Sequence, residues 1–240
     1  MDIKTGNGAF AAAPEMAREL AESITSVANG AGLHCTALIT DMDQVLGTSA
    51  GNALEIRETI DHLTGCTRDH RLHDVTMALC AELLVTGKLA ADFDVGRTMA
   101  EEALTSGRAA ERFARMCAGL GGPTDIIEAP EKHLPAAAIQ KPVAPTQPGV
   151  VTSMDTRRLG LAVMELGGGR RRADDAIDHA VGLSDMVGVG TRVDAHNPIC
   201  RIHAANQDVA ARVAALVSDA VTTGDATDGL RPIVHDRVSP

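Results

Sequence analysis

Residues 33–65 read LHCTALITDMDQVLGTSAGNALEIRETIDHLTG and indicate the order of elements most clearly. The short apolar run 33–39 predicts a buried strand, and a polar loop follows it. From Asn52 onward, apolar residues recur on one helical face until Gly65 ends the pattern. A strand, a loop and a helix in this order are typical of an α/β domain with a parallel sheet.

Helical spacing extends on both sides of this stretch. Toward the N-terminus, Pro14 suits the first turn of a helix, and apolar residues repeat at helical spacing as far as Gly30. Toward the C-terminus, residues 72–119 predict three further helices, the last two ended by Gly107 and Gly119.

Six of the ten prolines fall between residues 123 and 148. Such a stretch favours an extended backbone, so it predicts a linker between two domains. We therefore expect a partial α/β domain over residues 1–122, a proline-rich linker over 123–148, and a small β unit over 149–240.

The sequence after the linker has a different texture. Short apolar runs at 159–166, 187–193 and 199–203 alternate with glycine-rich turns and predict strands of a small all-β unit. A helix over residues 209–220 and a short strand near 233–234 are expected to follow.

The composition excludes several classes of function. The chain has 22 basic and 32 acidic residues, a net charge of −10, which argues against a general nucleic-acid binder. Three Phe with no Trp or Tyr provide no stacking platform for single strands. The start of the sequence resembles no signal peptide, and no apolar stretch reaches the ~18 residues of a membrane span. Five cysteines without a CxxC pair predict reduced thiols in the cytoplasm.

Glycines in DIKTGNGAF, residues 2–10, form the first candidate site. Glycines after a strand let backbone N–H groups approach an anion, and Lys4 could add a positive charge. The motif is not a P-loop, since no GK[ST] follows at the required distance. The alternative is an ordinary loop between a strand and a helix.

The loop that begins at Asp41 is the second candidate. It resembles the start of an EF-hand calcium loop, but Leu46 fills the position that needs glycine, so that interpretation fails. A tight loop could instead turn the carbonyls of Leu46 and Ser49 toward one point, with Glu58 completing an oxygen cage for a cation. The alternative is that Glu58 lies on a solvated helix face.

The run GGGRRR, residues 167–172, is the third candidate and could cradle a phosphate. Its alternative is a turn whose arginines pair with Asp174 and Asp175, and the acidic neighbours favour that interpretation. The nine histidines do not cluster, and no GxSxG motif indicates a serine nucleophile.

Five stretches together resemble the thymidine phosphorylase and pyrimidine nucleoside phosphorylase family, most of all its bacterial thymidine-cleaving members. In chain order they are KTGNGAF at 4–10, TDMDQVLGTSAGNALEIRE at 40–58, DVTMALCAELL at 74–84, GGPTD at 121–125 and SMDTRRLGLAVMELGGGRRRADDAIDHAVG at 153–182. The resemblance implies the C-terminal part of the phosphorylase α/β domain followed by a small barrel-sandwich β unit.

The activity implied by the resemblance is phosphorolysis of thymidine to thymine and 2-deoxyribose 1-phosphate, a pentosyl transfer. The family's phosphate loop and polar base contacts would precede residue 1, so no catalytic residue is expected within this chain. Phe10 matches a phenylalanine that lines the base pocket. Leu46, Ser49 and Glu58 match positions that hold a structural monovalent cation, K⁺, and no organic cofactor is implied.

The implied partners are a pyrimidine nucleoside, phosphate, the missing N-terminal half and a second copy in a homodimer, with no nucleic acid and no membrane. A different class of function stays open. The chain could be a non-catalytic fragment, or a complementing subunit that binds a separate N-terminal half.

Overall fold

The computed structural model describes residues 1–226 and 231–239, which fall into two units that interleave along the sequence. The loop that precedes Asn52 belongs with the C-terminal residues, and the last strand belongs with the N-terminal ones. The first unit consists of Met1–Met42, His62–Arg112 and Arg231–Pro240, and the second of Asp43–Asp61 and Phe113–Leu230.

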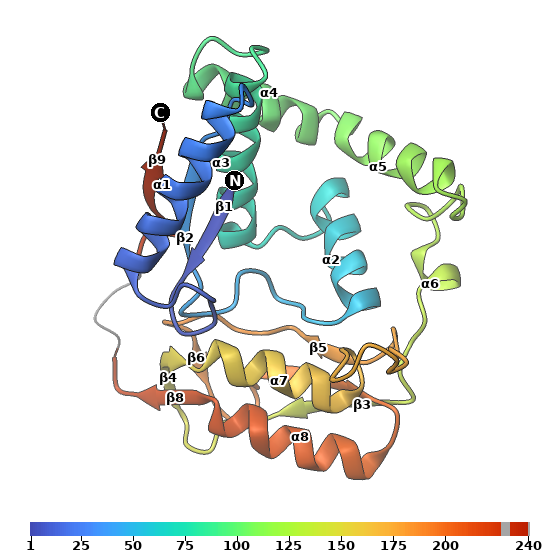
Figure 1. Ribbon diagram of the computed structural model, residues 1–240. Coiled ribbons are helices and arrows are strands. Elements are labelled where there is room, and N and C mark those ends of the chain that lie inside the picture. Colours follow the sequence, from blue (N-terminus) through green and yellow to red (C-terminus); the bar gives the residue numbers. More distant parts are fainter. Residues whose placement is uncertain (227–230, 240) are drawn as a thin grey trace. The chain divides into compact units, whose positions relative to one another are not determined.

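A three-stranded sheet organises the first unit. β1 (Asp2–Thr5) runs parallel to β2 (Ala37–Asp41), and β9 (Val234–Val238) pairs antiparallel on the other side of β2. The helix α1 (Pro14–Gly30) connects the two parallel strands (Figure 1). Every residue of the central strand β2 is buried, and its first three residues are apolar. The predicted parallel α/β order is confirmed, although the strand begins later than residue 33.

Three helices follow, as the sequence predicts. They are α3 (His70–Thr86), α4 (Phe93–Thr105) and α5 (Arg108–Gly119), the last of which continues into the second unit. The Asp69 carboxylate caps α3 by accepting from Leu72 N at 2.9 Å, and Asp92 caps α4 by accepting from Val95 N at 3.0 Å.

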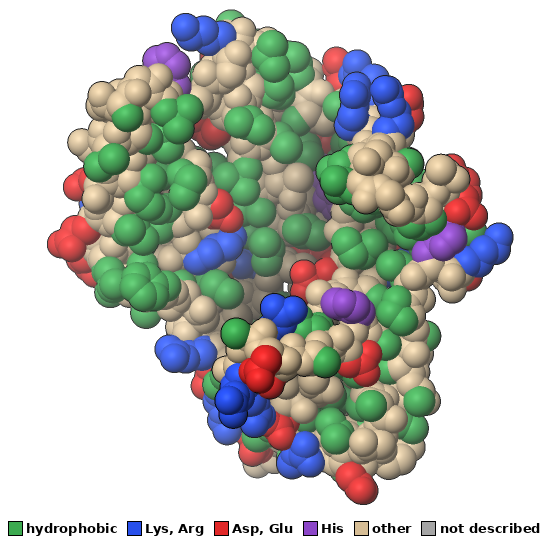
Figure 2. Space-filling model, turned by 45° about the vertical axis from the view of Figure 1, so that its right-hand side comes forward, with side chains coloured by type: hydrophobic (Ala, Val, Ile, Leu, Met, Phe, Trp, Pro, Cys, Tyr) green, Lys and Arg blue, Asp and Glu red, His purple; other side chains and the backbone are tan. Residues whose placement is uncertain are grey.

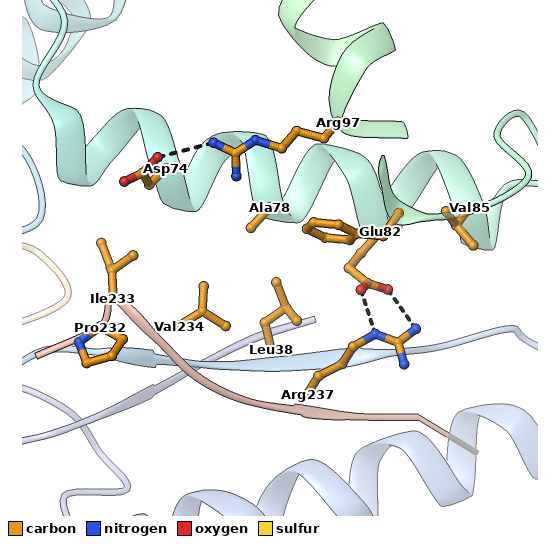
Figure 3. Close-up of a pocket in the computed structure, with 11 residues that line it drawn as sticks. Leu38, Asp74, Ala78, Glu82, Val85, Arg97, Pro232, Ile233, Val234 and Arg237 are labelled. Atoms are coloured by element: carbon orange, nitrogen blue, oxygen red, sulfur yellow. Dashed lines mark hydrogen bonds and ion pairs between the residues drawn. The ribbon is translucent and has the colours of Figure 1, made fainter. Parts of the chain in front are cut away.

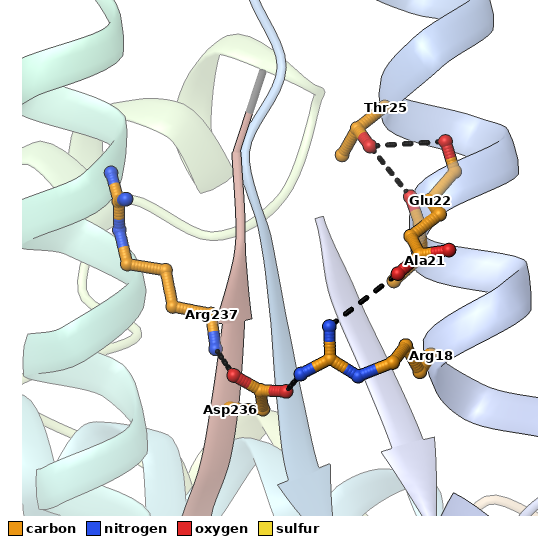
Figure 4. A network of polar contacts seen from close by, with 6 residues as sticks. All are labelled: Arg18, Ala21, Glu22, Thr25, Asp236 and Arg237. Atoms are coloured by element: carbon orange, nitrogen blue, oxygen red, sulfur yellow. Dashed lines mark hydrogen bonds and ion pairs between the residues drawn. The ribbon is translucent and has the colours of Figure 1, made fainter. Parts of the chain in front are cut away.

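The core of the first unit is small and rich in alanine. Its core cluster consists of the buried residues Ile3, Ala11, Ala17, Ala21, Ala37, Ile39 and Val238, and further buried apolar residues of the unit are Leu38, Val75, Met77, Ala78, Ala81 and Leu104. Polar contacts add to it (Figure 4): Arg18 on α1 forms ion pairs with Glu22 and with Asp236 on β9. The helix is therefore fastened to the sheet by charge as well as by packing.

Two antiparallel three-stranded sheets form the second unit, in the orders β3-β7-β5 and β6-β4-β8, with no closed barrel among the described residues. Their strands are β3 (Ile139–Val143), β4 (Gly149–Met154), β5 (Gly182–Ser184), β6 (Arg192–Val193), β7 (Cys200–Ala204) and β8 (Val221–Gly224). The helices of this unit are α2 (Asn52–Thr64, whose last residues belong to the first unit), α6 (Pro130–His133), α7 (Thr156–Leu166) and α8 (Gln207–Asp219).

The prediction of a strand at 159–166 is wrong, because these residues form α7. Asp155 caps this helix by accepting from Arg158 N at 2.9 Å, and Gly167, at φ +95°, ends it in the left-handed conformation. The apolar residues of the run lie on one helical face, whose buried members are Leu159, Ala162 and Leu166. In a run this short, apolar content alone does not separate a buried helix from a strand.

Of the other predicted elements of this region, one strand and one helix are confirmed. The run 199–203 corresponds to β7, and the predicted helix is α8. Only the end of the run 187–193 is a strand, β6. The proline-rich stretch is more ordered than a linker, since it contains α6 and the edge strand β3. Pro142 is tolerated in β3 because an edge strand has neighbours on one side only.

On the face shown in Figure 2, basic and acidic side chains are scattered among hydrophobic ones. Within residues 1–226 and 231–239, no helix combines the length and apolar character that crossing a membrane requires.

Candidate functional site

The carboxyl ends of the parallel strands β1 and β2 lie side by side, and in open α/β sheets ligands bind at this edge. The loop after β1 carries Phe10, and β2 ends at Asp41. Two backbone hydrogen bonds tie the edge together: Met42 N donates to Thr5 O at 2.7 Å, and Gly8 N donates to Met42 O at 3.2 Å.

The glycine loop uses its own amides. Gly6 N donates to Ala12 O at 3.2 Å, and Ala9 N donates to Gly6 O at 3.0 Å. Lys4 Nζ lies 2.7 Å from an Asp2 carboxylate oxygen, so its charge is already paired. These contacts leave little for an anion, and the interpretation of an ordinary loop between strand and helix fits the structure better than a phosphate cradle.

Phe10 is the most conspicuous side chain of this loop. It is 87% exposed, although most phenylalanines are buried. The ring is therefore free to form an apolar wall for a flat ligand, and its role in binding a base stays a prediction.

A buried ion pair lies at the end of β2. Arg71 on α3 donates to Asp41 Oδ2 at 2.8 Å, and the two residues are only 7% and 2% exposed. His235 Nε2 lies 3.5 Å from the other carboxylate oxygen. The pair fastens α3 to the edge of the sheet, and a buried pair of this kind is costly to break.

Glu58 on α2 reaches back to the loop that precedes its helix. Its carboxylate accepts from Thr48 N at 2.6 Å, from the Thr48 hydroxyl at 2.8 Å and from Ser49 N at 2.9 Å. The side chain is half-buried, so it does not lie on a solvated helix face. Gly47 makes this approach possible, because a Cβ at that position would lie 2.7 Å from Glu58 Oε1.

The three predicted ligands offer oxygen atoms, which hard cations take. Among the described residues, no N–H donates to the carbonyls of Leu46 or Ser49, whereas the Thr48 carbonyl accepts from Met186 N at 2.9 Å. A carboxylate accepts about four hydrogen bonds, and Glu58 receives three, so acceptor capacity remains. Two carbonyls and one carboxylate are oxygen ligands of the kind that hard cations take. Ligation by Leu46, Ser49 and Glu58 stays a prediction.

The arginine run fits the alternative of a turn with paired arginines in part, since Arg172 Nε lies 3.6 Å from Asp174 Oδ1. Asp175 accepts from the backbone N–H groups of both Arg171 and Arg172 at 2.9 Å, and Arg171 also pairs with Glu165. A carboxylate of the chain thus occupies the place where a phosphate would bind.

One cavity of the first unit lies between the sheet and α3 and has a volume of about 630 Å³ (Figure 3). Its charged residues pair with one another: Arg97 lies 3.3 Å from Asp74, and Arg237 lies 2.6 Å from Glu82. The hydrogen bond to Glu82 raises the pKa of the Arg237 guanidinium above its ordinary value. None of the residues predicted to form a site lines this cavity.

A second cavity of the first unit, also about 630 Å³, lies against α3 and α4. It is lined by apolar side chains and Cys80, together with polar and charged side chains such as Glu102 and Arg112. Burial raises the pKa of the Cys80 thiol, so the thiol stays protonated and is a poor nucleophile. Among the described residues, no group of three His, Cys, Asp or Glu side chains could hold a metal ion.

Two features of these sites are missed by sequence reasoning. The partners in the Asp41–Arg71 pair come from different elements, and nothing in their spacing signals the contact. Gln44, only 5% exposed, accepts from Val189 N at 2.9 Å across most of the chain length. In the sequence, the only signal for this contact is that Gln44 is a polar residue within the loop.

Comparison with known proteins gives two family matches. Residues 1–110 match the model described as "Glycosyl transferase family, a/b domain", and residues 150–224 match "Pyrimidine nucleoside phosphorylase C-terminal domain". Two proteins named thymidine phosphorylase, from Burkholderia cenocepacia strains J2315 and HI2424, are each 51% identical over 238 residues. The alignments cover 99% of this chain and 54% of each relative, so the chain spans about half the length of the curated relatives it matches.

Proposed function

Because this chain belongs to the thymidine phosphorylase and pyrimidine nucleoside phosphorylase family, we propose that it is the C-terminal part of a thymidine phosphorylase. The reaction is a pentosyl transfer in which thymidine and phosphate give thymine and 2-deoxyribose 1-phosphate. The observation that carries the proposal is the 51% identity over nearly the whole chain to proteins with that name.

The chemistry needs two sets of donors. Phosphate attacks the anomeric carbon while the base leaves with negative charge, so one set must hold phosphate and the other must stabilise the leaving base. The two stretches of this chain that suggested phosphate binding use their amides internally or for Asp175. We therefore assign phosphate binding and the polar base contacts to a separate segment that corresponds to the rest of the longer relatives.

This chain would contribute the apolar side of the base pocket. Phe10 follows β1 at the carboxyl edge of the parallel strands, and its exposed ring can pack against the face of a pyrimidine. Truncation of Phe10 should weaken nucleoside binding more than phosphate binding.

A structural K⁺ is the second contribution that we propose. The Leu46 and Ser49 carbonyls and the Glu58 carboxylate would hold it. When bound, the ion would neutralise the Glu58 charge and brace the loop. The chain's own amides at Thr48 and Ser49 already orient the carboxylate for this task.

The proposed partners are a pyrimidine nucleoside, phosphate, a segment equivalent to the N-terminal half of the relatives, and a second copy in the assembled enzyme. The proposed place is the cytoplasm, where a reducing environment keeps thiols in the reduced form. All five cysteines are free, in agreement with it.

Phosphate-dependent release of thymine tests the proposal. The purified chain should show no turnover of thymidine, and turnover should appear when the N-terminal half of a Burkholderia relative is added. Turnover by the chain alone would overturn the assignment of phosphate binding to another segment. No turnover in the mixture, given that the two parts bind each other, would favour a non-catalytic fragment.

A further inference from the structure

The loop before α2 is joined to the C-terminal strand β5 by a small antiparallel bridge within the second unit. Ala50 N donates to Leu183 O at 2.9 Å, and Leu183 N donates back to Ala50 O at 2.8 Å. Three residues after Leu183, Met186 N donates to Thr48 O at 2.9 Å. The loop lies in the region matched by the α/β family model and β5 in the region matched by the C-terminal one.

Two glycines make the bridge possible. A Cβ on Gly182 would lie 2.2 Å from Ala50 O, and a Cβ on Gly51 would lie 2.5 Å from Val181 O. Their φ angles of +153° and +135° also favour glycine. The two backbones are therefore closer than any side chain at these positions allows.

A buried side chain adds a third contact. The Gln44 amide oxygen accepts from Val189 N at 2.9 Å, and a Cβ on Gly188 would lie 3.2 Å from that oxygen. Gln44 precedes the proposed cation ligands in the same loop. The start of the loop is thus fixed by Val189, its middle by Met186 and its end by Leu183.

The loop is held from two sides. Glu58 fixes the N–H groups of Thr48 and Ser49, and the C-terminal segment Gly182–Val189 fixes the Thr48 carbonyl and the backbone of Ala50. We propose that Gly182–Val189 is a clamp that positions the carbonyls of the cation loop, with Gly182 as its main positioning residue. The cation part of this inference rests on the proposed function, whereas the ordering of the loop does not.

The matched pair Gly182→Ala and Gly167→Ala tests the clamp in the full chain. Both glycines have positive φ in the C-terminal region, so both substitutions strain the backbone. Only Gly182→Ala drives a Cβ into the loop, because nothing lies within 4 Å of a Cβ at Gly167. Two readouts are needed: hydrogen exchange at the Thr48 and Ser49 amides, and the shift of melting temperature when KCl replaces NaCl at constant ionic strength.

We expect Gly182→Ala to speed exchange at both amides by about tenfold or more, since the loop loses its anchor. It should also weaken K⁺ binding by about tenfold or more, as changes in supporting shells of metal sites do. Gly167→Ala should lower the melting temperature and change neither readout. Unchanged amide exchange in Gly182→Ala, or equal effects of the two variants, would overturn the clamp. A wild-type chain that does not respond to K⁺ would overturn the cation proposal alone.

Discussion

The two units are stabilised in different ways. In the first, the core cluster has seven buried residues, four of them alanine. In the second, the core cluster has nineteen buried residues, only four of them alanine, and Val, Ile and Leu dominate. Since hydrophobic stabilisation scales with buried apolar area, the second unit has far more of it to hold its fold.

The first unit compensates with charge. Arg71 binds Asp41, Arg237 binds Glu82, and Arg18 binds Asp236, and each pair joins a helix to a strand of the sheet. The second unit has ion pairs as well, such as Arg212 with Glu165, and it adds two antiparallel sheets and close glycine contacts.

Breaking the buried pair should have the largest effect. Arg71→Met removes the guanidinium that pairs with the buried Asp41 carboxylate. The loss should lower the free energy of unfolding by about 3–5 kcal/mol. Urea unfolding followed by circular dichroism at ~222 nm measures this, because a chain without Trp or Tyr has little intrinsic fluorescence.

Arg97→Met is the matched control for that substitution. Arg97 pairs with Asp74, but the two side chains are 40% and 49% exposed, so its loss should cost about 0–1 kcal/mol. Equal effects of the two substitutions would show that the first unit does not depend on its buried pair.

The second unit should respond less to the loss of one carboxylate. Glu58→Ala leaves the amides of Thr48 and Ser49 without their acceptor, at a cost of about 1–3 kcal/mol. Glu58→Gln keeps one acceptor oxygen and should fall between wild type and Glu58→Ala. Thermal unfolding of both, with the exposed Glu131→Ala as control, checks the order, and a neutral Glu58→Ala would contradict it.

The smallest expected effect concerns pH. His203 is 7% exposed, and burial lowers its pKa below the ordinary value of about 6.5. Below that pH the unfolded chain binds the proton and the folded chain resists it, so stability falls as the pH falls.

His203→Gln removes the titrating group, so the variant should not lose the free energy of unfolding that the wild type loses through His203 at low pH. The difference in free energy of unfolding between variant and wild type should therefore change between pH ~7.5 and ~5. Chemical unfolding at the two pH values measures it, and His179→Gln at an exposed position serves as the control. A gap that stays constant across this range would rule out the titration of His203.

The sequence predicts helices and strands well where the pattern lies within one element. Helical spacing around Asn52 and the glycine and proline punctuation locate most helices, and the buried strand β2 follows from one apolar run. The run 159–166 misleads because a helix buried on one face and a short strand have the same apolar content. Contacts such as Gln44 with Val189 and Asp41 with Arg71 depend on tertiary pairing, which no spacing within one element encodes.

Hydrogen exchange of the whole chain, alone and with the N-terminal half of a Burkholderia relative, tests the central claim most directly. The claim, which follows from the proposed function, is that a segment equivalent to the N-terminal half of the relatives packs on the first unit, where β1 is an edge strand. We expect the added half to slow exchange in β1 and α1 strongly and to leave β4, β7 and α8 unchanged. Equal protection of both units in the chain alone, with no change on addition, would contradict it.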